Sequence, residues 1–309
     1  MIPLDSRGDY TTNGAKDGHW VLEQVAGQNM FPGLSEFPAH VPLDRAEQTL
    51  LHADRPVHSV YINSDAATAA EVIPSFLAQM PELRSLTLPS QTALSLRPEM
   101  LGSSIKELRF HGHYDTRYWD NKTVVLPAGE VFSGVEALSG PTMASRVETR
   151  FRFDPALFPD LCAIGFTFDP KRRFADTLRR LHRLTVVSAA AFDDIDTLAD
   201  LLPCPEIISL TLAWNKKIET LAGIERFPNL RYLKLSSLTN LRSLAAITAL
   251  QRLEFVGIYW SKRVDQAEAL LTLPALQRIG TFGVDPKQPT WQTVQQGLAA
   301  RNIDVLLIG

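Results

Sequence analysis

One spacing of apolar residues constrains the fold of this chain more than any other feature. The pattern Leu-x-x-Leu-x-Leu, or a close apolar variant, recurs about every 20 to 30 residues between Val57 and Ile308, a period typical of repeat architectures. Its frames are Val57/Val60/Ile62, Leu83/Leu86/Leu88, Ile105/Leu108/Phe110, Val135/Leu138, Leu161/Ile164/Phe166, Leu181/Leu184/Val186, Ile207/Leu210/Leu212, Leu230/Leu233/Leu235, Leu250/Leu253/Phe255, Leu276/Ile279 and Ile303/Leu306/Ile308. So long a run of copies predicts a solenoid built from small stacked units.

The pattern has a direct physical explanation, because one such unit cannot bury its own apolar side. Alternating apolar residues in a short strand point to one face, and stacked strands then share a continuous core. We therefore expect an α/β fold: a right-handed solenoid curved like a horseshoe, with a parallel sheet on its concave face. Helices, 3₁₀ turns and plain turns should form the convex face.

The stretch from Ile207 to Phe255 resembles the leucine-rich repeat superfamily. Leu210, Leu212 and Asn215 match its L-x-L-x-x-N core, and the following apolar residues Ile218, Leu221 and Ile224 resemble the 22-residue repeats of internalins and related bacterial proteins. In that family the asparagine side chain satisfies backbone groups in the turn after each strand. The other frames depart from the pattern at this position, where they carry Gln91, His113, Asp169, Ala189, Leu238 and Ile258.

The frames also suggest how the chain is organised. Residues 1–40 contain no frame and are rich in Gly and Pro, so we expect an irregular arm that covers the first repeat. The covering segment would be Trp20 to Ala26 followed by the short helix over 44–52, and the alternative is a peptide that another protein binds. Residues 41–283 should form about nine to ten repeats, interrupted by an irregular insertion near 111–145. Residues 284–309 should form a cap, in which a helix from Trp291 to Arg301 precedes a last strand.

The convex segments are expected to vary along the chain. Helices are predicted over 44–52, over 65–80 with a kink at Pro74, over 171–180 and over 192–202. The segment 238–248 is too short for more than a turn of helix or 3₁₀.

Composition indicates a soluble globular protein. The chain has 309 residues, of which 45% are hydrophobic and 21% charged, and no apolar run approaches the ~18 residues that span a bilayer. We expect no secretion signal, because no basic segment followed by a hydrophobic one opens the sequence. Only two cysteines, Cys162 and Cys204, are present, which favours a reducing compartment. We therefore predict a cytoplasmic monomer, with export by a signal-peptide-independent system as the alternative.

The charge balance argues against nucleic acid as the partner. The formal net charge is −3, and a nucleic-acid-binding chain usually carries a basic surface. Residues 201–283 nonetheless hold ten Lys or Arg against six acids, a local excess that suits an acidic protein partner.

No motif in the sequence predicts catalysis. It contains no Gly-rich phosphate loop, no dinucleotide fingerprint, no H-E-x-x-H and no G-x-S-x-G. Cys162 lies inside a strand frame and Cys204 lies between Pro203 and Pro205, so both are interpreted as small buried residues. We expect neither enzyme activity nor a cofactor.

The concave face of the late repeats is the predicted binding surface. Stacked frames place their non-core positions in columns, which read Arg183, Ser209, Tyr232, Arg252 and Arg278, and beside them Thr185, Thr211, Lys234, Glu254 and Gly280. Arg and Tyr often carry binding energy at protein interfaces. The predicted contact residues are Arg183, Trp214, Tyr232, Lys234, Arg252, Glu254, Tyr259, Trp260 and Arg278. The alternative is that the charged column is only a solvated face and that Trp214 and Tyr259 pack into neighbouring repeats.

The insertion holds a second candidate. Its sequence HGHYDTRYWDN carries aromatic residues suited to a binding loop, namely Tyr114, Tyr118 and Trp119. In an extended segment His111, His113 and Asp115 would share one face, as a metal site requires, but no second ligand cluster accompanies them. We therefore predict no metal, and keep a binding loop and a plain surface insertion as alternatives.

Taken together, these features predict a non-catalytic bacterial scaffold that recognises a protein partner through its concave face and flanking loops. The resemblance implies protein–protein recognition in general. A bacterial immunity or regulatory protein is the first interpretation, and a secreted effector that targets a host protein is the second. A metal-dependent enzyme that uses the His111/His113 loop is the third.

Overall fold

The computed structural model describes residues 19–23, 40–42, 45–53, 56–64, 68–111, 123–140, 150–167, 174–192, 194–283 and 289–308. These residues fall into two compact units, one within residues 13–167 and one within residues 168–309. They are called the N-terminal unit and the C-terminal unit below. Each contributes parallel strands to a 13-stranded sheet, which confirms the expected α/β repeat fold.

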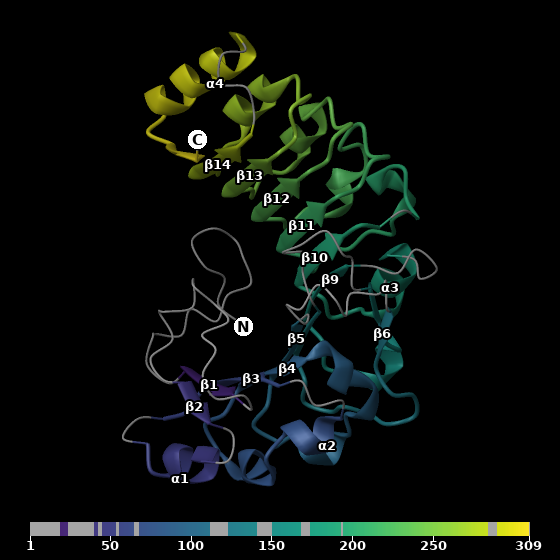
Figure 1. Cartoon of the computed structure of the whole chain (residues 1–309). Helices are drawn as coiled ribbons and strands as arrows, with labels where there is room; N and C mark the ends of the chain where they lie inside the picture. Colours follow the sequence, from purple (N-terminus) through teal and green to yellow (C-terminus); the bar gives the residue numbers. More distant parts are fainter. Residues whose placement is uncertain are drawn as a thin grey trace. The chain divides into compact units, whose positions relative to one another are not determined.

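The C-terminal unit is a stack of parallel strands that lie side by side (Figure 1). They are β10 (Val186–Ala190), β11 (Ser209–Ala213), β12 (Tyr232–Ser236), β13 (Phe255–Tyr259), β14 (Arg278–Phe282) and β15 (Asp304–Ile308). From β10 to β14, paired residues on neighbouring strands differ by 23 positions, as in Ser209 with Tyr232 and Phe255 with Arg278. The repeat is therefore constant at 23 residues over this stretch.

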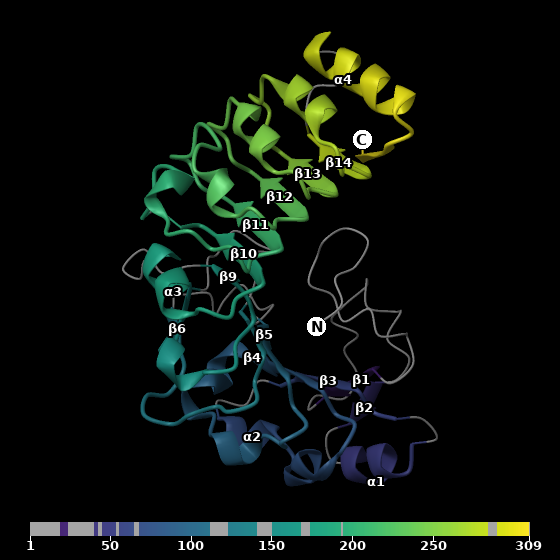
Figure 2. The ribbon, with the colours of Figure 1, turned by 180° about the vertical axis from the view of Figure 1, so that it is seen from behind.

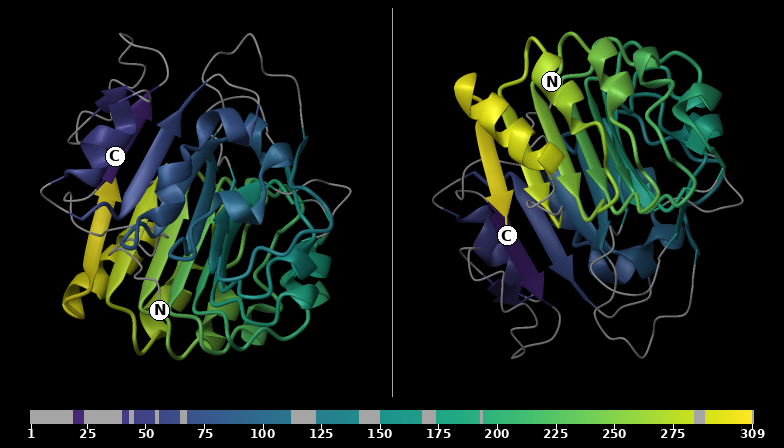
Figure 3. Two further views of the ribbon diagram at one scale, coloured as in Figure 1. Left: turned by 90° about the horizontal axis from the view of Figure 1, so that it is seen from below. Right: turned by 90° about the horizontal axis from the view of Figure 1, so that it is seen from above.

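A constant period puts equivalent side chains on top of one another. In the repeat that begins at Leu230, eight apolar side chains are buried at 0% exposure: Leu230, Leu233, Leu235, Leu238, Leu241, Leu244, Ile247 and Leu250. Residues 23 positions earlier and later fill the same columns, so each layer of the core touches the next. The short 3₁₀ turns, η8 (Ile224–Arg226), η9 (Ala245–Ala249) and η10 (Ala267–Thr272), lie on one side of this sheet (Figures 2 and 3). The opposite side of the sheet is called the open face.

Each strand from β10 to β14 is followed by a residue with left-handed backbone geometry. The positions are Ala191, Trp214, Ser237, Trp260 and Gly283, with φ between 51° and 69°. The first four donate their backbone N–H to the last carbonyl of the next strand, for example Trp260 to Phe282 O at 2.7 Å. This geometry is unusual for residues other than Gly, Asn and Asp. Its recurrence at a 23-residue interval indicates that the turn is required by the architecture.

The turn after β11 holds the asparagine that the family resemblance implies. Asn215 is fully buried, and its Nδ2 donates to Phe192 O at 2.7 Å while its Oδ1 accepts from the N–H groups of Lys217 and Ile218. Ser261 occupies the equivalent position after β13, where its hydroxyl accepts from Leu238 N–H at 3.2 Å. The expected role of Asn215 is therefore confirmed.

The sequence frames are wrong in three repeats of this unit. The strand register shows that the equivalents of Leu230/Leu233/Leu235 are Leu253/Val256/Ile258, three residues later than Leu250/Leu253/Phe255. The same correction replaces Leu181/Leu184/Val186 by Leu184/Val187/Ala189. In the last strand Val305 and Leu307, not Leu306 and Ile308, pair with the core positions Ile279 and Thr281. The cause is that apolar residues recur every third position through most of each repeat, so the same spacing fits two frames.

The N-terminal unit is also a parallel sheet, but its repeat length varies. Its strands, in spatial order, are β2 (His40–Pro42), β1 (His19–Glu23), β3 (Ser59–Asn63), β4 (Ser85–Pro89), β5 (Glu107–His111), β7 (Ala137–Ser139) and β9 (Ala163–Thr167). Paired residues from β3 to β9 differ by 26, 22, 30 and 26 positions. The predicted frames in this unit are confirmed for Leu86, Leu108, Leu138 and Ile164, which share one core column.

Strand β1 of this sheet lies inside the range 1–40 expected to be an irregular arm, and β2 begins at the last residue of that range. β1 includes Trp20 and pairs along its whole length with β3, while β2 pairs with the other edge of β1. The long interval near 111–145 also contains a strand, β6 (Thr123–Val125), which pairs with β8 (Arg150–Arg152) apart from the main sheet.

Helices are fewer and shorter than expected among the described residues. Helix α1 (Ala46–Leu51) and helix α3 (Phe174–Arg180) are confirmed, while the 65–80 segment holds only α2 (Ala69–Val72) and the 3₁₀ turn η2 (Ser75–Gln79), on either side of Pro74. The helix expected over 192–202 is wrong, since only the 3₁₀ turn η7 (Leu198–Asp200) forms there. As expected, 238–248 contributes only the start of η9. None of the helices in the described ranges has the length and hydrophobicity to span a bilayer.

A longer helix follows β14, as the sequence predicts. Helix α4 (Pro289–Ala300) buries Trp291, Val294 and Leu298, which recur at helical spacing on one side. It packs against η10, and Arg301 just after it donates to the carbonyls of Leu271 and Leu273 at 2.5 and 2.6 Å. The last described repeat of the C-terminal unit is thereby covered, and β15 completes the sheet beside β14.

Candidate functional site

The open face of the C-terminal unit carries three columns of side chains. The first column reads Val186, Ser209, Tyr232, Phe255, Arg278 and Asp304; the second reads Ser188, Thr211, Lys234, Gly257 and Gly280; the third reads Ala190, Ala213, Ser236, Tyr259 and Phe282. Small residues fill the columns at β10 and β11, whereas aromatic and charged residues gather on β12 to β14. We call Tyr232, Lys234, Phe255, Tyr259, Arg278 and Phe282, together with Trp260 at the end of β13, the aromatic patch.

Two glycines form the floor of the aromatic patch. A Cβ atom on Gly257 would lie 2.6 Å from Tyr259 Cε2, and one on Gly280 would lie 2.6 Å from Tyr259 Oη. Phe255 comes to 3.2 Å from the same Cβ position on Gly257. Glycine inside a strand weakens it and often marks a place where another group approaches closely. Here the missing side chains allow the rings of Tyr259 and Phe255 to lie close against the backbone of the sheet.

Further aromatic contacts extend this surface to the end of the strands. The indole of Trp260 meets the ring of Phe282 edge to face, with 4.9 Å between centroids, and lies 6.3 Å from the ring of Tyr259. Trp260 is 52% exposed, although its backbone is held in the left-handed region. Phe255, by contrast, is only 2% exposed. The patch therefore combines a buried aromatic base with an exposed indole at its edge.

The patch also contains two cations, Lys234 and Arg278. Lys234 Nζ lies 5.3 Å from the centroid of the Tyr259 ring, a cation–π distance. Arg278 Nε donates to Asp304 Oδ2 at 2.9 Å. Amphipathic rings with nearby cations are a combination that protein interfaces favour.

A second ion pair lies just before the strands. Arg231 makes two hydrogen bonds to Glu254, at 2.7 and 2.9 Å, and its guanidinium lies 5.7 Å from the ring centroid of Tyr232. The hydrogen bond to the Glu254 carboxylate raises the pKa of Arg231 above its ordinary value. Arg231 and Glu254 therefore form an ion pair at this edge of the patch.

The corrected register changes the predicted contact residues. Tyr232, Lys234 and Arg278 lie in the open-face columns, and Tyr259 lies beside them in the third column. Arg183, Arg252 and Glu254 were predicted in the first and second columns and do not belong there. Arg183 and Arg252 lie in the turns before β10 and β13, where Arg252 donates to Asn229 Oδ1 at 2.8 Å. Glu254 precedes the strand and pairs with Arg231.

The remaining predicted contact residues are Trp214 and the residues of the insertion. Trp214 is half-buried at the left-handed turn after β11, two repeats from Trp260 and separated from it by Ser237. Among the insertion residues, His113, Tyr114, Tyr118 and Trp119 lie outside the described residues, as does Asp115.

His111 is described, and it contributes to the fold. Its ring stacks on Tyr61 with 4.5 Å between centroids, and its Nε2 lies 2.8 Å from Ile62 O. Within the described ranges, no three His, Cys, Asp or Glu side chains are grouped so that they could hold a metal ion.

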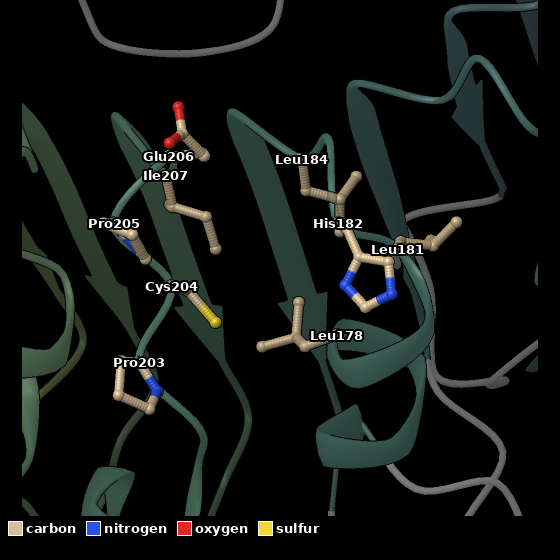
Figure 4. Close-up of a pocket in the computed structure, with 9 residues that line it drawn as sticks. All are labelled: Leu178, Leu181, His182, Leu184, Pro203, Cys204, Pro205, Glu206 and Ile207. Carbon is tan, nitrogen blue, oxygen red and sulfur yellow. The ribbon is translucent and has the colours of Figure 1, made fainter.

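A pocket of about 230 Å³ lies elsewhere in the C-terminal unit (Figure 4). Its walls come from Leu178, Leu181, His182 and Leu184 on one side and from the segment 203–207 on the other. Cys204 occupies the core column that Phe227, Leu250 and Leu273 fill in later repeats, all at 0% exposure. The pocket therefore exists because a small side chain replaces a large one.

The Cys204 thiol in this pocket is poorly suited to act as a nucleophile. Burial raises the pKa of Cys204, which disfavours the reactive thiolate, and its Sγ lies 3.2 Å from Leu202 O. Both cysteines are half-buried, somewhat more open than the sequence suggested.

Sequence reasoning missed Phe255, Phe282 and Gly257 as parts of the patch, and it placed Gly280 in the second column without giving it a role. Phe255 had been assigned to the core because of the three-residue frame error, and the glycines carried no signal by themselves. The alternation Phe-x-Gly-x-Tyr in 255–259, followed by Arg-x-Gly-x-Phe in 278–282, could have identified them, because both segments place Gly between larger residues on one face of a strand.

Comparisons with known proteins leave the partner of this chain open. No protein-family model and no curated protein matches the sequence. Solved structures that resemble it include an internalin from Listeria monocytogenes, with 15% identity, a TM-score of 0.38 and coverage of 81% of this chain and 78% of that one. A leucine-rich repeat protein from Leptospira interrogans has 15% identity, a TM-score of 0.39 and coverage of 81% and 83%.

A third similar structure is a leucine-rich repeat-containing protein from Legionella pneumophila. It has 15% identity, a TM-score of 0.41 and coverage of 81% of this chain and 90% of that one. The description of the fold as a repeat solenoid rests on the chain's own strand register, its core columns and the hydrogen bonds of Asn215.

Proposed function

We propose that this chain is a non-catalytic scaffold that binds a protein partner through the open face of its C-terminal unit, centred on the aromatic patch. The observation that carries the proposal is the arrangement of Tyr259 over Gly257 and Gly280, with the exposed Trp260 beside it. Two glycines inside neighbouring strands cost stability, so a ring held against the sheet is a feature that stability by itself does not favour.

The chemistry of the patch supports a protein as the partner. Tyr and Trp offer large, rigid contact areas with a polar group at the edge, and Lys234 and Arg278 can pair with acidic side chains. The ends of the β12–β14 strands extend the surface to Trp260. Two free cysteines support a reducing compartment, and we propose a cytoplasmic monomer on that basis.

The biological setting that we propose first is a bacterial immunity or regulatory protein, as expected from the resemblance. A secreted effector that acts on a host protein is the alternative. A toxin gene next to the coding sequence would favour immunity, and a secretion cluster would favour the effector.

The binding proposal is tested with one double variant and one matched control. A partner recovered by pull-down with the wild-type chain should bind the Tyr259→Ala/Trp260→Ala variant at least about tenfold more weakly, since aromatic anchors dominate interface energies. The control is Leu202→Ser, which alters an exposed apolar side chain, 53% accessible, in a turn of the same unit. Isothermal titration calorimetry measures both affinities.

A second variant separates ring position from ring loss. Gly280→Ala places a methyl group against Tyr259 Oη and displaces the ring without deleting any contact side chain. We expect weaker binding with an unchanged circular dichroism spectrum. The proposed site is refuted if the partner binds the wild type, the double variant and Gly280→Ala with equal affinity.

A further inference from the structure

A basic pocket lies in the turns that follow β12 and β13, beyond the aromatic patch. It has a volume of about 380 Å³ and is lined by Arg242, Lys262, Arg263 and Asp265. All four side chains are exposed. Three cations and one carboxylate give the pocket a formal charge of +2, in a chain whose net charge is −3.

The repeat register brings these residues together from two successive turns. Arg242 and Asp265 occupy equivalent positions 23 residues apart, and Asp265 N–H donates to Arg242 O at 2.5 Å. Lys262 and Arg263 lie at the positions that Thr239 and Asn240 hold one repeat earlier. The backbone of the solenoid thus fixes the spacing of the three cations.

These cations are not neutralised within the described part of the chain. Arg242, Lys262 and Asp265 take part in no ion pair there, and the guanidinium of Arg263 makes a 3.4 Å hydrogen bond to the neutral Asn240 Oδ1. Other cations of the same unit are paired, as Lys217 is with Asp196 at 3.1 Å and Arg231 with Glu254 at 2.7 Å. The pocket therefore brings three positive charges together with only one carboxylate.

We propose that this pocket binds an oxyanion carried by the protein partner, either a carboxylate or a phosphoryl group. Guanidinium and ammonium groups form their strongest hydrogen bonds with such anions, and a bound anion relieves the mutual repulsion of the cations. The exposed Trp260 lies only two residues before Lys262, so a segment that contacts the aromatic patch can continue into the pocket. The inference rests on the proposed function and adds the chemistry of one partner group.

The pocket can be tested without knowing the partner. The ¹⁵N-labelled full chain is titrated with inorganic phosphate and, separately, with acetate, at low and constant ionic strength set with sodium chloride. Amide signals of residues 239–243 and 262–266 should shift with phosphate. In Arg242→Gln/Lys262→Gln the affinity should fall by at least about tenfold, because two of the three charge-assisted partners are removed.

The matched control carries the same charge change at two sites outside the pocket. Arg252→Gln/Lys106→Gln should bind phosphate within about twofold of the wild type, because neither side chain lines the pocket. Shifts with phosphate only identify a phosphoryl group as the ligand, and shifts with both anions show that a carboxylate suffices. No shift with either anion, or equal affinity in the Arg242→Gln/Lys262→Gln variant, overturns the proposal.

The outcome stays separate from that of the aromatic patch. If the partner loses affinity for Tyr259→Ala/Trp260→Ala while Arg242→Gln/Lys262→Gln binds it normally, the scaffold function stands and the oxyanion site fails. If phosphate binds the pocket while the patch variants keep full affinity for the partner, the pocket stands and the proposed binding face fails.

Discussion

The two units of this protein use the same parallel strands with different regularity. In the C-terminal unit every interval between β10 and β14 is 23 residues, while in the N-terminal unit the intervals between β3 and β9 vary from 22 to 30. A constant interval allows the same turn geometry to recur after each strand. The left-handed turn residue recurs five times in the C-terminal unit, from Ala191 to Gly283.

In the N-terminal unit, each turn is stabilised by its own set of hydrogen bonds. Where the buried Asn215 makes three hydrogen bonds, Gln91 at the equivalent frame position donates only to Ser64 O, at 3.0 Å. Ser90 donates its hydroxyl to His111 O, and the His111 ring reaches Ile62 O two strands away. Irregular spacing therefore replaces a repeated turn by separate long-range contacts, and the comparison predicts different responses to mutation.

The largest difference should appear when a core aromatic residue is truncated. Phe227→Ala removes a fully buried ring from a column shared by neighbouring repeats and should cost about 3–5 kcal/mol. Because each repeat is stabilised by its neighbours, faster amide exchange should spread from β11 to the adjacent strands. Phe132→Ala in the N-terminal unit should cost a similar amount.

The response to Phe132→Ala should stay more local. Phe132 stacks on Phe158, which in turn meets Phe153, so the loss concerns one aromatic cluster. Urea denaturation and hydrogen exchange measure both variants. Equal spreading of exchange in the two units would contradict the proposed difference between them.

A smaller effect should distinguish the two turn amides. Asn215→Ala leaves a buried carbonyl, a buried N–H and a part-buried N–H without their partner and should cost about 2–4 kcal/mol, whereas Gln91→Ala loses one bond and should cost about 1 kcal/mol. Asn229→Ala is the control: this half-buried amide in a turn of the C-terminal unit makes its hydrogen bonds to Pro205 O and Arg252 at the surface, and its loss should change stability by less than about 1 kcal/mol. Chemical denaturation gives all three values, and the interpretation fails if Gln91 proves the more important amide.

The smallest effect should be a gain of stability at Cys204. Leucine at this position would restore the large side chain that the column has in later repeats and should stabilise the unit by about 1 kcal/mol through added apolar burial. The same change at Cys162 in the N-terminal unit, where no repeated column predicts leucine, should bring no gain. Thermal unfolding of Cys204→Leu and Cys162→Leu decides the matter, and a lower midpoint for Cys204→Leu would show that the pocket cannot admit the larger side chain.

Much of the fold could be predicted from the sequence because the apolar spacing is a direct record of burial. Parallel strands, the core residues Leu210 and Leu233, the final helix and strand, and the role of Asn215 all followed from it. The frames in the repeats that begin at Leu184 and Leu253 could not be assigned correctly, since apolar residues every third position satisfy the same pattern in two alignments. That ambiguity moved Arg252 and Glu254 into the predicted columns and left Phe255 out.

The apolar spacing was sufficient to predict that the chain stacks short parallel strands over a shared core, because only stacking can bury one apolar side of each repeat. It also identified Tyr232, Lys234, Tyr259 and Arg278 as candidates for the binding face. Which side chains meet there could be known only from the folded chain, because neighbours on a sheet come from different repeats and depend on the pairing register. The space over Gly257 and Gly280 that Tyr259 fills, and the convergence of Arg242 with Lys262 and Arg263, exist only once that register is set.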